Sequence, residues 1–173
     1  MSHSNFAFLS EHEPIFLQLA HNAEQLFSAD PNTTLIKLRQ LGEALAQDIA
    51  IRVGIDFDVQ TSQSDLLYKL NSRISLDSII RDLFHTLRIE GNKATHQFQT
   101  SHKQALDGLK IARALAVWYH QSFGAKGTSF KPGKFLLPQD PSEDLRHLQG
   151  EIAQLKATLT EAHQRVEESA ELA

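Results

Sequence analysis

Apolar residues recur three and four positions apart along most of the chain, which is the period of an amphipathic α-helix. Proline in a first turn and Asp or Ser just before it are typical helix starts, and glycine is a typical stop. We therefore predict an all-α fold, with a five-helix bundle over residues 1–123. The expected helices run from Pro14 to Phe27, from Asp30–Pro31 toward Gly54, from about Ser64 to Leu70, from Ser75 to Gly91–Asn92 and from Ser101 to Phe123.

The composition changes after the last of these helices. Residues 124–141 are rich in Gly, Lys, Ser and Pro, and no continuous helix crosses their prolines, so we expect a basic linker. From 142 to 173 the apolar period returns as the a/d seam of a coiled-coil helix. Such a helix needs a partner, either a second copy or a downstream part of a longer chain. The oligomerisation seam that we predict comprises Leu145, Leu148, Ile152, Leu155, Leu159 and Val166.

Composition limits the chemistry. The 173 residues include no cysteine, which excludes disulfides, thiolate zinc sites and a cysteine nucleophile. The N-terminus lacks the pattern of a secretory signal and no apolar run approaches membrane-spanning length, so we expect a cytoplasmic protein without membrane contact. The formal net charge is -4, and any contact with nucleic acid must therefore be local.

Two motifs suggest binding sites at first sight. Nine histidines are present, but no pair has zinc-ligand spacing with supporting carboxylates, so we predict no metal site. The segment 127–135 has the glycines and lysine of a phosphate loop, but five residues separate its glycines and a phenylalanine replaces the magnesium-binding hydroxyl. It is better interpreted as part of the basic linker. Lys126, Lys131 and Lys134 form a compact basic group there and are our candidates for phosphate contacts.

A further polar group is expected at the glycine turn between the fourth and fifth helices. Arg88, Asn92 and His96 are close together in the sequence around Gly91. The structural interpretation, which we favour from the residues alone, is that Asn92 caps the next turn, Arg88 pairs with a carboxylate and His96 bonds to the backbone. The alternative is a functional cluster.

Several of these segments, taken in order, resemble one family. They are Asn5–Leu9, Leu38–Ala46, Leu87–His96, Ala105–Phe123 and Lys131–Pro138. Together they look like the helical domain of uncharacterised function at the N-terminus of many type I restriction endonuclease R subunits and related helicases. The resemblance covers roughly the first four-fifths of the chain. It implies a fold similar to the HEPN bundles, some of which are metal-independent ribonucleases that use an arginine and a histidine. Those residues would be Arg88 and His96, although their separation is wider than is usual in the nucleases.

The resemblance implies a non-catalytic module that binds nucleic acid or docks another subunit of such an enzyme. Its expected partners are DNA, the other restriction subunits and a second copy through the coiled coil. We expect no cofactor in this chain, whereas ATP and magnesium would serve other parts of a larger enzyme. Two alternatives remain open: a HEPN-type ribonuclease in which Arg88 and His96 act on RNA at a dimer interface, and a purely structural self-association module.

Overall fold

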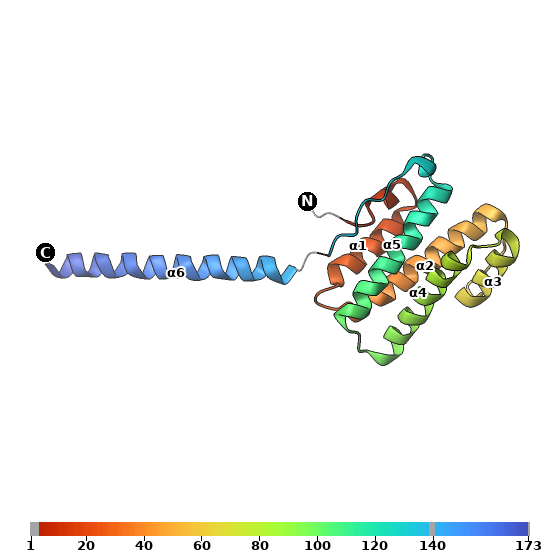
Figure 1. Cartoon of the computed structure of the whole chain (residues 1–173). Coiled ribbons are helices and arrows are strands. Elements are labelled where there is room, and N and C mark those ends of the chain that lie inside the picture. Colours follow the sequence, from red (N-terminus) through yellow and green to blue (C-terminus); the bar gives the residue numbers. More distant parts are fainter. Residues whose placement is uncertain (1–3, 139–140, 173) are drawn as a thin grey trace. The chain divides into compact units, whose positions relative to one another are not determined.

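The computed structural model describes residues 4–138 and 141–172, and within the last helix it describes side chains from Arg146 to Ala170. The described residues up to Pro138 form one compact unit, and the last helix, α6 (Pro141–Leu172), forms another (Figure 1). All regular elements in the described part are helical, which confirms the predicted all-α fold.

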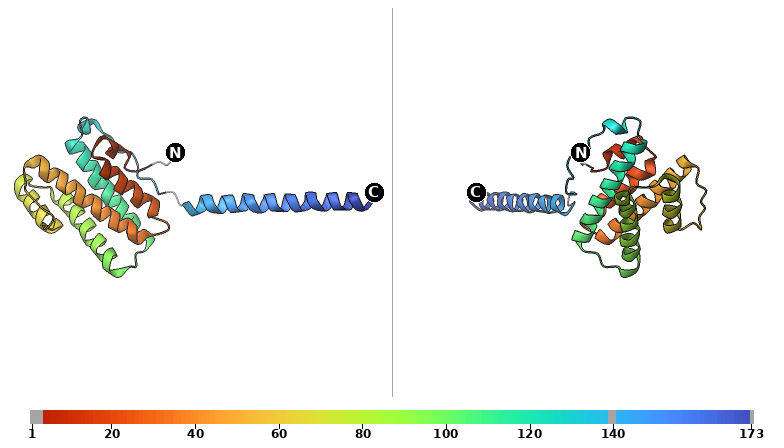
Figure 2. Two further views of the ribbon diagram at one scale, coloured as in Figure 1. Left: turned by 180° about the vertical axis from the view of Figure 1, so that it is seen from behind. Right: turned by 45° about the vertical axis from the view of Figure 1, so that its right-hand side comes forward.

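The compact unit is a bundle built around its longest helix. α2 contacts the four other long helices, because its buried apolar residues extend around much of its circumference (Figures 1 and 2). Leu38, Leu41, Leu45 and Ile49 of α2 are completely buried in the core. The elements of this unit are η1 (Ala7–Glu11), α1 (Pro14–Leu26), α2 (Pro31–Val53), α3 (Gln63–Ile74), α4 (Ser78–Gln97), α5 (His102–Phe123) and η2 (Gly127–Ser129).

Local signals set several helix ends as expected. The Asp30 side chain accepts a hydrogen bond of 3.1 Å from the Thr33 amide at the start of α2. Gly54 ends that helix in the left-handed conformation, at a φ of 74°. At the start of α5, Ser101 and Gln104 form the predicted capping box. These three boundaries follow from residues that are neighbours in the sequence.

The predicted end of α4 is wrong. Gly91 and Asn92 do not stop the helix, which continues to Gln97 and ends at Phe98. Gly91 is buried at the contact with α2, so it allows a close approach between helices instead of a left-handed turn. Tertiary packing thus overrides the low helix propensity of glycine at this position.

The basic segment after α5 is fastened to the bundle and is not a free strand. The Asn5 side chain donates to the carbonyl of Leu136 and accepts from its amide, both at 2.7 Å. Arg113 of α5 donates to the carbonyls of Pro132 and Gly133, and its Nε donates to the carbonyl of Asn5 at 3.2 Å. Residues near the start of the chain therefore fix the path of residues 132–136.

A pair of histidines joins the N-terminal turn to the end of α5. His12 Nε2 lies 2.8 Å from Nδ1 of His120, and His120 Nε2 lies 3.4 Å from the carboxylate of Glu11. One ring must donate and the other accept, so the contact requires an unprotonated nitrogen. Burial lowers the pKa of His12, and the nearby His120 and Arg52 lower it further, against the opposing charges of Glu11 and Asp48.

The lowered pKa predicts acid sensitivity. In the unfolded chain His12 takes up a proton near pH 6.5, whereas in the folded protein it does so only at lower pH. The unfolded state therefore binds more protons, and the free energy of unfolding should fall as the pH drops below about 6.5. His12→Gln should flatten this dependence in urea unfolding at pH 7.5 and 5.5. The exposed His163 of α6 offers the control, His163→Gln, and an equal slope in wild type and His12→Gln would contradict the prediction.

Candidate functional site

Helices α2 and α4 approach each other closely at Gly91. A Cβ atom on Gly91 would lie 2.3 Å from Cβ of Arg39, which real side chains do not tolerate. Four residues earlier, Leu87 packs against Gly42, where a Cβ would meet its side chain at 3.5 Å. The two segments 38–46 and 87–96 thus face each other across this contact.

Polar side chains connect the helices where they approach most closely. Arg39 Nη1 donates to Asn92 Oδ1 at 3.2 Å and to Thr95 Oγ1 at 3.1 Å. The Thr95 hydroxyl in turn donates to the Gly91 carbonyl at 3.0 Å. The guanidinium is 3.5 Å from Glu43 on its own helix, although its buried Nε makes no hydrogen bond among the described residues. We call Arg39, Gly91, Asn92 and Thr95 the α2–α4 clamp.

The structure does not gather Arg88, Asn92 and His96 around a turn. All three lie on the continuous helix α4, and Asn92 accepts from Arg39 instead of capping a new helix. Arg88 has a buried Nε without a hydrogen bond and forms no ion pair in the described part of the chain. His96 is exposed and makes no hydrogen bond there. The detailed structural interpretation of these three residues is therefore wrong, although Asn92 is structural in another way.

Helix geometry separates the two residues of the ribonuclease hypothesis. Eight residues of α-helix put about 12 Å of axial rise between Arg88 and His96. An arginine and a histidine that act together must converge on one phosphate. The imidazole nearer to Arg88 is His85, whose pKa is lowered by burial and then by Arg88, with Asp82 opposing. A catalytic role of Arg88 and His96 stays a prediction.

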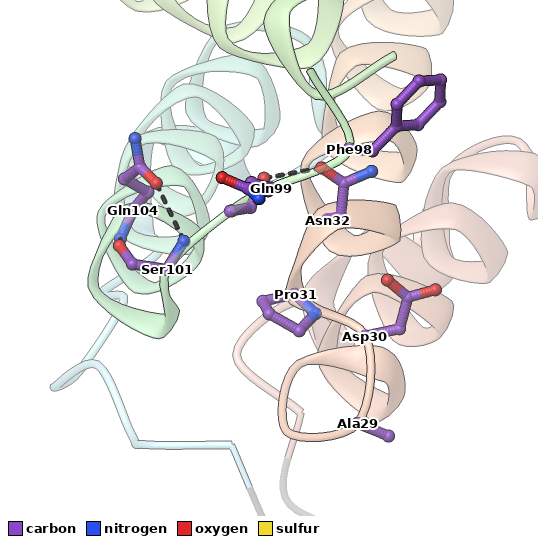
Figure 3. Close-up of a pocket in the computed structure, with 9 residues that line it drawn as sticks. Ala29, Asp30, Pro31, Asn32, Phe98, Gln99, Ser101 and Gln104 are labelled. Atoms are coloured by element: carbon purple, nitrogen blue, oxygen red, sulfur yellow. Dashed lines mark hydrogen bonds between the residues drawn. The ribbon is translucent and has the colours of Figure 1, made fainter. Parts of the chain in front are cut away.

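A hollow opens beyond the C-terminal end of α4, where this helix meets the starts of α2 and α5 (Figure 3). Asn32 connects two of its walls, since its Nδ2 donates to the Ala94 carbonyl at 3.0 Å and its Oδ1 accepts from Thr100 at 2.7 Å. Phe98 lies on the rim with 79% of its surface exposed. Sequence reasoning missed this hollow because residues about 70 positions apart form it.

The three candidate lysines lie elsewhere. Lys126, Lys131 and Lys134 are all exposed, at or after the end of α5. Lys126 borders a second hollow together with His120, Glu11 and Phe130. Lys131 and Lys134 flank Pro132 and Gly133, whose carbonyls Arg113 holds. Their side chains are therefore presented from a backbone that is held in place.

The predicted seam of α6 is uncovered. Its side chains Leu148, Ile152, Leu155, Leu159 and Val166 are between 45% and 68% exposed. Leu145 also belongs to the predicted seam, but its side chain lies outside the described residues. Each of two histidines on this helix pairs with a glutamate four residues later, at 3.6 Å for His147 and 3.3 Å for His163. Side-chain pairs four residues apart of this kind are typical of an exposed helix face.

No group of three or more His, Asp or Glu side chains within residues 4–138 and 141–172 could hold a metal ion. None of the helices over the same ranges is long and apolar enough to cross a membrane.

Comparison with known proteins shows the family of this chain. Residues 21–122, which contain the last part of α1, all of α2 to α4 and α5 except Phe123, match a domain of unknown function called DUF4145. The chain belongs to the DUF4145 family. It is also 36% identical over 171 residues to the type I restriction enzyme EcoKI endonuclease subunit of Escherichia coli K12, a match that covers 99% of the chain and 14% of the relative. The predicted resemblance to a type I restriction subunit domain is confirmed. No solved structure matches significantly.

The close contact between α2 and α4 in this DUF4145 domain can be tested by adding one methyl group at residue 91. Gly91→Ala should lower the free energy of unfolding by about 1–3 kcal/mol, because Arg39 has no room to move away without losing its bonds to Asn92 and Thr95. Gly150→Ala in α6 is the matched control, since its added Cβ meets nothing within 4 Å. Urea denaturation measures both. Equal stability of Gly91→Ala and wild type would show that α2 and α4 do not approach this closely.

Proposed function

We propose that this chain is a non-catalytic module of a type I restriction endonuclease R subunit, where it binds nucleic acid or docks another subunit. The observation that carries the proposal is the clamp, in which polar residues of the two most characteristic segments fasten α2 to α4. Arg39 bonds to Asn92 and Thr95 and lies 3.5 Å from Glu43, and the Thr95 hydroxyl donates to the Gly91 carbonyl, so these polar groups are engaged in contacts within and between the two helices. Since the chain spans 14% of its relative, ATP-dependent DNA restriction belongs to the larger enzyme in this proposal.

DNA is the partner that we propose for the basic segment. The three lysines are exposed, and Lys131 and Lys134 lie on a backbone that Arg113 and Asn5 fasten, so they can contact phosphates without reading bases. Such contacts are weak and salt-dependent because they release counterions. We place the protein in the cytoplasm, with ATP and magnesium acting in other parts of the larger enzyme.

The basic segment can be tested by reversing its charge. Changing Lys126, Lys131 and Lys134 together to Glu should weaken DNA binding at least tenfold at low salt and reduce its salt dependence. Fluorescence anisotropy with a labelled duplex measures both. A triple variant of Lys37, Lys69 and Lys93 to Glu has the same net charge and should bind better than the first variant. Equal loss in both variants would mean that net charge, and not this segment, controls binding.

We further propose that α6 pairs in parallel with a second copy. In the heptad register of the seam, Ile152 and Val166 occupy a positions and Leu148 and Leu155 occupy d positions, and β-branched residues at a with Leu at d favour two-stranded coils. Glu151 then falls at a g position and Lys156 at the following e position, so their opposite charges meet across a parallel pair. The exposure of the seam supports this pairing.

Polar residues in the seam should produce monomers. Leu148→Gln with Leu155→Gln removes two d-position contacts, so sedimentation should show a monomer with lower helix content, because most of the stability of a helix in a protein comes from packing its apolar face. Ala153→Gln with Ala157→Gln, on the outer face of the same helix, should leave the dimer intact. A wild-type chain that is already monomeric at high micromolar concentration would contradict self-pairing and favour a partner segment in the larger protein.

A further inference from the structure

Arg88 carries a positive charge that the described part of the bundle does not balance. Its side chain is partly buried on α4, and its buried Nε has no hydrogen-bond partner there. Arg39 of α2 also has a buried Nε without a hydrogen bond, but its Nη1 is bonded to Asn92 and Thr95. Arg88 has no such bond and no ion pair among the described residues. A partly buried cation without an acceptor is costly, so its five N–H donors suit an anionic ligand.

The acidic residues on the neighbouring turns are engaged elsewhere. Glu90, two positions further along α4, lies 3.5 Å from Nζ of Lys93. Glu43, on the facing helix α2, lies 3.5 Å from Nε of Arg39. Neither carboxylate forms an ion pair with Arg88. The anion that would complete Arg88 must therefore come from outside the described part of the chain.

Helix spacing brings further donors to the same side of α4. His85, Asn92 and Arg81 are respectively three, four and seven residues from Arg88, and residues at these spacings share one helix face. The Asn92 oxygen accepts from Arg39, which leaves its Nδ2 as a donor. The Arg81 side chain, like that of Arg88, makes no hydrogen bond or ion pair in the described residues. We call Arg81, His85, Arg88 and Asn92 the basic face of α4.

The ionisation of His85 shows that the charges on this face lie within reach of one another. Burial lowers the pKa of His85, and the charges of Arg88 and, to a smaller extent, Arg81 lower it further, while Asp82 opposes them. His85 is therefore neutral at pH 7 and contributes one N–H donor. Two arginines outnumber the single acid that acts on this histidine. The basic face thus has a net positive charge.

We propose that the basic face of α4 binds the phosphate backbone of DNA, with Arg88 as the principal contact. A guanidinium matches a phosphate through two parallel hydrogen bonds. Seven residues of α-helix put about 10.5 Å of axial rise between Arg81 and Arg88. A chain of linked phosphates can meet both arginines, whereas one small anion meets only one. This inference rests on the proposed nucleic-acid binding and adds a second surface to the lysines after α5.

Arg88→Met separates binding from stability, because methionine keeps the packing of the side-chain stem and removes the charge. Affinity for a short labelled duplex should fall about tenfold at low salt, with a salt dependence smaller by about one phosphate contact. The urea midpoint should stay the same or rise, since no protein partner is lost. Lys37→Met removes the same charge two residues from Arg39, on the opposite side of α2, and should change neither quantity.

His85 reports whether phosphate reaches this face. Phosphate beside Arg88 offsets the charge that lowers the pKa of His85, so duplex DNA should raise that pKa in an NMR titration of the imidazole protons. His85→Gln identifies the signal. Inorganic phosphate at the same concentration of phosphate groups should leave the pKa unchanged, because separate ions lack the linked contacts of a strand. An equal rise with inorganic phosphate would make the ligand a free phosphate and contradict the DNA assignment.

The other outcomes are also decisive. Unchanged DNA affinity of Arg88→Met, or an unchanged pKa of His85 with DNA bound, would overturn this site and leave binding by the three lysines in place. Absence of DNA binding by the wild type would overturn the proposed nucleic-acid function as well. A lower urea midpoint of Arg88→Met would show that the guanidinium has a structural role. Unchanged DNA affinity with lost association with another restriction subunit would make Arg88 a protein contact.

Discussion

The approach of α2 to α4 at Gly91 is the constraint on which the rest of this domain depends. Because residue 91 lacks a side chain, Arg39 lies directly against the backbone of α4, and its guanidinium reaches Asn92 and Thr95. The same contact keeps α4 helical beyond the glycine. That extension carries α4 far enough for Asn32 to bond to the Ala94 carbonyl, and it sets the position of the hollow at the starts of α2 and α5.

A second set of hydrogen bonds fixes the segment that follows α5, again through polar side chains that join distant parts of the chain. Buried Glu24 accepts from the backbone and side chain of Asn5 at 3.0 and 3.1 Å. Asn5 then bonds to both backbone groups of Leu136, so the chain leaves the bundle along a defined path. Segments that resemble a restriction-subunit domain thus build a rigid scaffold, while the charged and aromatic groups that remain exposed are available to partners.

Much of the fold could be predicted from sequence because its signals are local. Helix starts at Asp30 and Ser101 and the stop at Gly54 depend on residues within one turn, and the apolar stripe of α2 identifies its buried face. The role of Gly91 could not be predicted, because glycine at a helix end and glycine at a helix contact look alike until the partner helix is known. Contacts such as Asn5 to Leu136 and His12 to His120 join residues more than 100 positions apart, so the spacing of apolar residues along the sequence cannot predict them. Exposure of Phe98 likewise leaves no sequence signal.

The central claim is that the clamp residues act structurally. A double-mutant cycle of Arg39→Met and Thr95→Val tests it most directly, because both changes keep the packing of the side-chain stem or the β-branch, and the cycle separates the polar contact of 3.1 Å from the other bonds that each residue makes. The free energies of unfolding should show a coupling of about 0.5–1.5 kcal/mol between the two positions. Additive effects, within about 0.3 kcal/mol, would mean that Arg39 does not hold α2 to α4 and would contradict the structural role assigned to these residues.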